Sequence, residues 1–164
     1  MNFKNVFQIF VLSYLTWLAL NWSVHADVLF TGAIISVLVA VLLCSQCKVL
    51  QEVRLTPKSL AYAFAFVGVF WWELIKSNLD VAMRVLTPSL PINPGIVEVK
   101  THLQSDIGKM LLANAITLTP GTLTVDILGD RMFIHWIDVT STDIDEATRA
   151  IVSKFEKFLE VMYG

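Results

Sequence analysis

Charged residues are scarce in this chain. Only 16% of its 164 residues are charged, against about 25% in an average soluble domain. Hydrophobic residues make up 55%, and the mean hydropathy of +0.66 indicates membrane residence. The net charge is −2 and no basic stripe is present, which argues against nucleic-acid binding.

Cysteine and catalytic motifs are also scarce. The two cysteines form one C-x-x-C pair, Cys44 and Cys47, with no second pair to complete a zinc site and no βαβ pattern typical of a redox centre. We interpret them as unpaired thiols near a membrane surface. The sequence has no Walker loop, G-x-G-x-x-G, G-x-S-x-G or H-E-x-x-H. The chain has only three histidines, and metal binding would need more ligands than are visible in the sequence. We therefore expect no catalytic residue, no cofactor and no metal site.

Two apolar runs are present near the start of the chain. We predict membrane spans at about residues 6–22 and 26–45, because a bilayer core needs roughly 20 apolar residues. The connection between them is so short that the two runs are expected to form a helical hairpin. Lys4 precedes the hairpin and Lys48, Arg54 and Lys58 follow it, which predicts both of its ends in the cytoplasm.

A secretory signal is the alternative for the first run. Val24-His25-Ala26 offers a small-residue cleavage site after an apolar stretch. The run is long for a signal core, however, and a second apolar run follows at once. We therefore favour the hairpin, with His25 and Asp27 outside the cell.

A third apolar run leads into a charged stripe. Residues 60–72 are uncharged, but thirteen residues are too few for a span. Beyond them, charges recur every three or four residues, as neighbours on one helix face. We predict one long helix over about residues 59–86, embedded in part from the cytoplasmic side, with a third full span as the alternative. The stripe consists of Glu73, Lys76, Asp80 and Arg84.

Glu73 is of interest because a carboxylate beside an apolar run can be a proton or cation site. No second carboxylate lies in any apolar run. We therefore interpret Glu73 as a surface residue, solvated or paired with Lys76, and keep the ion-related role as the weaker hypothesis.

The composition of one short segment indicates a stiff linker between two parts of the chain. Residues 87–95 contain three prolines and one glycine, which is typical of an extended connection. We therefore predict a membrane region at residues 1–86, the linker at 87–95 and a cytoplasmic α+β domain at 96–164.

The domain is expected to have the order β-α-β-β-α. Strands are predicted at 96–100, 122–128 and 132–139, with a turn at Gly129-Asp130. Ser105-Asp106 is expected to cap a helix ending near residue 118, and Thr142-Asp143 to cap one last helix.

The string at residues 119–122 is the most distinctive short motif. Thr119 and Pro120 end the apolar helix, Gly121 turns the chain, and Thr122 begins the strand. It follows a helix rather than opening one, so it is not a phosphate cradle. We predict a structural corner that contacts a partner subunit.

These residues also carry a resemblance. The string LANAITLTPGTLTVDI at residues 112–127, with PINPGIVEV at 91–99 and FIHWIDV at 133–139, resembles the E-type subunit of the Mrp/Mnh/Pha multisubunit cation/proton antiporters. The resemblance extends over nearly the whole chain. It implies an accessory subunit of a sodium- or potassium-type antiporter in the bacterial cell membrane. The larger subunits of that family move the ions, and this one would support their assembly.

Two other classes stay open. One is a membrane-anchored binding module whose tail recruits a partner. The other is a small membrane enzyme that uses His135 and Asp126 as an acid–base pair across the last hairpin. We favour the hypothesis of an antiporter subunit, whose expected partners are the lipid bilayer and other hydrophobic antiporter subunits.

Overall fold

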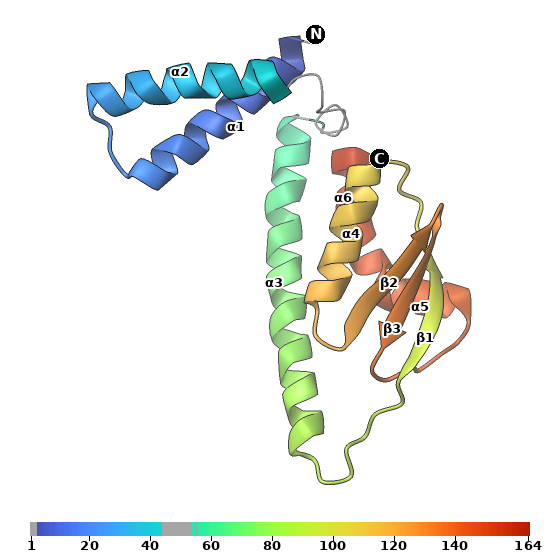
Figure 1. Cartoon of the computed structure of the whole chain (residues 1–164). Coiled ribbons are helices and arrows are strands. Elements are labelled where there is room, and N and C mark those ends of the chain that lie inside the picture. Colours follow the sequence, from blue (N-terminus) through green and yellow to red (C-terminus); the bar gives the residue numbers. More distant parts are fainter. Residues whose placement is uncertain (1–2, 44–53, 55) are drawn as a thin grey trace. The chain divides into compact units, whose positions relative to one another are not determined.

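The computed structural model describes residues 3–43, 54 and 56–164. The chain forms two compact units, Met1–Val53 and Arg54–Gly164. The first is helical, and the second combines one long helix with a small sheet and shorter helices (Figure 1). Cys44 and Cys47 lie outside the described residues.

The first unit is a hairpin of α1, Phe3–Asn21, and α2, Ala26–Leu43. The buried residues of α2 are Gly32, Ser36 and Ala40, one turn apart, so the helices approach closely along a row of small side chains. A Cβ on Gly32 would overlap the Trp17 indole. That indole donates a hydrogen bond from Nε1 to the carbonyl of Val28 at 3.0 Å. The predicted helical hairpin is therefore present.

Among the described residues, two helices are long and apolar enough to cross a membrane by length and composition, α2 and α3. The apolar part of α1, Val6–Asn21, is shorter than that criterion requires. The N-terminal region therefore holds two candidate membrane helices.

The long helix α3 is Pro57–Leu86, close to the predicted range. Its N-cap is Thr56, whose hydroxyl accepts a hydrogen bond from the Ser59 amide at 3.1 Å. Pro57 lies in the first helical turn, where proline is favoured, and Thr56 before it is therefore the cap. Ser59 donates to the carbonyl of Val161 at 3.4 Å.

Three antiparallel strands form the sheet in the order β1-β3-β2. Strand β1 is Gly95–Lys100, β2 is Thr122–Leu128 and β3 is Arg131–Trp136. The chain turns between β2 and β3 at Gly129, whose φ is +67°. The register of β2 against β3 shifts between Thr124 and Asp126, an irregularity of the β-bulge type.

Helix α4, Asp106–Leu118, begins at the predicted cap Ser105. The one helix predicted at the end of the chain is two, α5, Ile144–Ile151, and α6, Ser153–Tyr163. They join at Val152, whose fully buried side chain lies in the core at the break. Asp143 caps α5 by accepting from the amides of residues 145 and 146. The observed order is therefore β-α-β-β-α-α.

The core of the second unit lies between the sheet and its helices. Helix α4 packs on β2, α5 on β1, and α6 on α4 and α3 (Figure 1). Its largest fully buried side chain is Phe155 of α6. Phe66 and Phe70 of α3 pack against that ring at centroid distances of 6.1 and 6.5 Å. By contacts, α3 belongs to the sheet unit, whereas composition placed the boundary at residues 87–95.

Candidate functional site

A pocket of about 280 Å³ lies where α3 meets the corner at residues 119–122, and we call it the corner pocket. Its walls also include the segment after β3 and residues of α5 and α6. The corner motif and Glu73, which the sequence singled out separately, line this one pocket.

The corner is built by hydroxyl groups that close the end of α4. Thr119 donates from Oγ1 to the carbonyl of Ala115 at 2.8 Å. Thr122 donates from Oγ1 to the carbonyl of Ile116 at 2.7 Å. These bonds satisfy carbonyls that a helix end leaves without an internal partner. Pro120 has no amide hydrogen and ends the helix.

Gly121 makes the turn that follows. Its φ is +91°, in the region that favours glycine. A Cβ at this position would lie 3.0 Å from Cγ2 of Ile137. Its carbonyl accepts from the Ile137 amide at 2.8 Å. Conformation and space both require glycine here.

The charged stripe of α3 lines the corner pocket. Glu73 pairs with Lys154 of α6 at 2.7 Å, and their side chains are 17% and 31% exposed. The expected partner Lys76 forms no ion pair among the described residues. The sequence proposed Lys76 because it is a helix neighbour, but the packing of α6 on α3 places Lys154 closer.

Arg84 also lines the pocket. It pairs with Asp80 at 2.7 Å on its own helix and with Asp138 after β3 at 2.9 Å. It also donates from Nη1 to the carbonyl of Pro91 at 2.6 Å. One guanidinium thereby ties α3, the proline-rich linker and the end of the sheet together, as its several fixed donors allow.

The outward face of α3 is apolar. Its aromatic and aliphatic side chains are exposed along the whole helix, although a soluble domain would turn such a face into its core. The exposed large apolar residues are Leu60, Phe64, Val67, Trp71, Trp72, Ile75, Leu79, Met83, Val85 and Leu86. We call this set the outer stripe of α3.

The structure does not bring the proposed acid–base pair together. His135 lies opposite Leu123, whereas Asp126 lies opposite Phe133. The Asp126 carboxylate accepts from the amide of Ile127 at 2.8 Å. The small-enzyme hypothesis therefore has no geometric basis in this hairpin.

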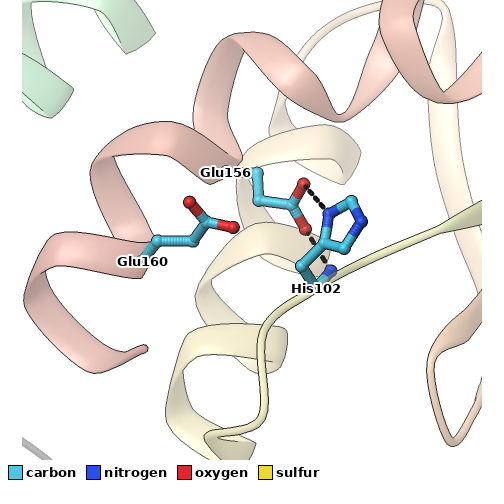
Figure 2. A group of neighbouring side chains, drawn as sticks. All are labelled: His102, Glu156 and Glu160. Atoms are coloured by element: carbon cyan, nitrogen blue, oxygen red, sulfur yellow. Dashed lines mark hydrogen bonds and ion pairs between the residues drawn. The ribbon is translucent and has the colours of Figure 1, made fainter.

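A second cluster was missed from sequence. His102 follows β1, and Glu156 and Glu160 lie one turn apart on α6 (Figure 2). The i, i+4 spacing of the two glutamates was visible in the sequence. No local signal placed His102 beside them, because it is 54 residues away from Glu156. The same holds for Lys154, which is 81 residues from Glu73.

The carboxylates of the corner pocket are paired. Among the residues that the structure describes, the pocket lining contains neither histidine nor cysteine. Its three carboxylates, Glu73, Asp80 and Asp138, each form an ion pair. These ion pairs join α3 to α6 and to the segment after β3.

The family model and the relatives found by sequence comparison name the same kind of subunit. The family model described as Na+/H+ ion antiporter subunit, MNHE, matches residues 10–161. The E-type subunit of the Na(+)/H(+) antiporter of Alkalihalophilus pseudofirmus is 44% identical over 98 residues. That of Bacillus subtilis is 42% identical over 94 residues. These stretches cover 58% and 56% of this chain and 61% and 58% of the two relatives, so the chain matches less than two thirds of their length.

A solved structure matches almost the whole chain. It belongs to the membrane-bound sulfane sulfur reductase, described as an archaeal respiratory membrane complex. The similarity has a TM-score of 0.85 and 44% sequence identity, and covers 96% of this chain and 98% of the other.

Proposed function

The chain belongs to the Na+/H+ antiporter subunit family, and from this premise we propose that it is a non-catalytic accessory subunit of a multisubunit cation/proton antiporter. It supports assembly of the complex and thereby cation and pH homeostasis. The curated relatives carry the name of that subunit. We assign no ion-selecting group to this chain.

The observation that carries this proposal is the orientation of α3. Its charged stripe contacts the domain, and its outer stripe points away from it. So much exposed apolar surface is typical of a region that another apolar phase covers. In a membrane complex, lipid and the helices of neighbouring subunits can both cover such a surface. The proposed partners are therefore the bilayer and other hydrophobic subunits.

We propose that α3 lies at the membrane surface and is embedded in part, with the domain in the cytoplasm. Contacts with the domain run along its length, from Ser59 with Val161 to Arg84 with Asp138. A third full span would therefore draw the charged domain into the hydrocarbon, at a cost of several kcal/mol for a single desolvated ion. The hairpin of α1 and α2 would supply the spans of this multi-pass cell-membrane protein, and residues 1–86 its membrane region.

We propose that the corner motif, Thr119 to Thr122, and Glu73 have structural roles. Every hydroxyl bond at the corner goes to a backbone carbonyl of α4 or of the corner itself. Glu73 already has Lys154 as its partner. The corner therefore holds α3 against the domain, and a partner subunit would meet the outer stripe beside it.

A second type of assembly is favoured by one observation. The solved structure that matches almost the whole chain comes from a respiratory membrane complex. The same fold would then serve a membrane assembly that carries out a redox reaction. The two candidates differ in their partners, because only the second requires redox subunits.

Deletion and complementation test the proposal. Deletion is expected to cause sensitivity to sodium or potassium at alkaline pH, and the wild-type chain to restore growth. The Glu73→Gln variant is expected to restore it as well, because an accessory role needs no ionisable group there. Loss of ion exchange in Glu73→Gln, with the complex intact, would assign Glu73 to ion movement. Growth unaffected by deletion would contradict the antiporter role.

A further inference from the structure

The cluster of His102, Glu156 and Glu160 lies apart from the corner pocket, whose lining contains none of the three residues. One ligand atom from each residue lies within 4.8 Å of the other two. The three side chains point toward one another from the loop after β1 and from α6 (Figure 2).

Glu156 is unusual because it is a buried carboxylate, with only 6% of the residue exposed. Its Oε1 accepts from the Thr101 hydroxyl at 2.5 Å and from the His102 amide at 2.7 Å. Its Oε2 lies 3.3 Å from Nδ1 of His102. One carboxylate oxygen is thus fixed by donors, and the other faces the cluster.

Within the described part of the chain, this carboxylate has no permanently charged ion-pair partner. Among the described residues, neither Lys nor Arg forms an ion pair with Glu156, and its cationic partner is His102, which carries charge only when protonated. A buried charge is ordinarily paired or coordinates a metal. Glu160, exposed on the same face of α6, adds a second negative charge. The cluster therefore attracts a cation.

We propose that His102, Glu156 and Glu160 bind a divalent transition-metal ion of the zinc type. One imidazole nitrogen and two carboxylate oxygens are donors that zinc accepts, with water completing the coordination. Ligands about 2.1 Å from a metal lie roughly 3.5 Å apart in a tetrahedral site. Glu160 must therefore move inward. Its exposed position on the helix leaves its side chain free to do so.

The predicted consequence is structural. The metal would join the loop after β1 to α6. Helix α6 also carries the core residue Phe155 and Lys154, which pairs with Glu73. Because the native state supplies the three ligands together, the metal would raise the stability of the folded chain by mass action.

The test uses the full chain in mild detergent, with Cys44→Ser and Cys47→Ser so that the C-x-x-C pair cannot bind zinc. Titration of Zn²⁺ against a chromophoric chelator is expected to show one site per chain. His102→Ala and Glu160→Gln are each expected to weaken binding about tenfold or more. The matched controls His135→Ala and Glu146→Gln, which change a histidine and an exposed carboxylate elsewhere, are expected to leave it unchanged.

Two further readouts separate a site from general charge attraction. Zn²⁺ should raise the melting temperature of the cysteine-free chain and not that of its His102→Ala variant. Co²⁺ should give visible ligand-field bands without a thiolate charge-transfer band. The proposal is overturned by absent binding, by binding that survives both ligand variants, or by equal loss in the controls. None of these outcomes bears on assembly of the antiporter, which is measured separately.

Discussion

Helix α2 and the sheet unit bury different kinds of residues. In α2 the buried residues are the small ones, Gly32, Ser36 and Ala40, while large apolar side chains point outward. In the sheet unit the buried residues are large, led by Phe155 and Leu103. Burying large side chains gains free energy in water, whereas in lipid the gain comes from close backbone approach. This difference fits the proposal that the hairpin lies in the membrane and the sheet unit in water.

Helix α3 combines the two patterns. Its first half packs aromatic rings on Phe155, as a core helix does, and its second half forms ion pairs with the domain. Its outer stripe, however, resembles the outward surface of α2. This helix therefore has features of both α2 and the core of the sheet unit.

The largest effect is expected from the core of the sheet unit. Phe155→Ala should destabilise this unit by about 3–5 kcal/mol, because it removes a fully buried ring and leaves a cavity. Phe64→Ala is the matched control, since that ring is 71% exposed on the outer stripe. Melting in detergent measures both. Equal losses would mean that the outer stripe is packed inside the unit, and the comparison of the two patterns would fail.

The stability of the hairpin should fall when a small side chain at the helix contact is replaced by a larger one. Gly32→Leu should separate α1 from α2, because its side chain would overlap Trp17, at a cost of about 1–3 kcal/mol from overpacking. Gly68→Leu is the control, because nothing lies within 4 Å of a Cβ at that helical position. Heating in detergent followed by size-exclusion chromatography measures the remaining folded chain. A Gly32→Leu protein as stable as Gly68→Leu would contradict the close approach.

At the corner, Gly121→Ala should cost about 1–2 kcal/mol for the left-handed backbone, with a further penalty from Ile137. Gly129→Ala is the control. Gly129 also has a positive φ, but nothing lies within 4 Å of a Cβ added at this position. The difference between the two melting temperatures therefore measures the contact with Ile137. Equal values would show that the corner has room to adjust.

The smallest effect is expected from the pair of Glu73 and Lys154. A double-mutant cycle with Glu73→Gln and Lys154→Met should give a coupling of about 1 kcal/mol, because the side chains are partly exposed. The same cycle with Lys76→Met should give none, since Lys76 forms no ion pair among the described residues. Coupling of Glu73 to Lys76 instead would restore the sequence-based interpretation.

Local signals in the sequence predicted local structure well. The strand at residues 122–128 and the end of α4 at 118 agree with prediction, because turn residues and alternation mark them. Long-range pairs such as Glu73 with Lys154 could not be predicted, because only tertiary packing brings them together. The break at Val152 was missed for the same reason: the apolar pattern runs through it, and the fold bends there to keep α5 on β1 and α6 on α3.

The most direct test of the central claim is purification of the tagged chain from native membranes in mild detergent, with mass spectrometry of the proteins that accompany it. The account predicts several very hydrophobic antiporter subunits in near-equal amounts. Redox subunits in the same preparation would assign the chain to a respiratory complex. A chain that purifies alone, or with one soluble partner, would contradict the accessory role and point to the domain as a binding module.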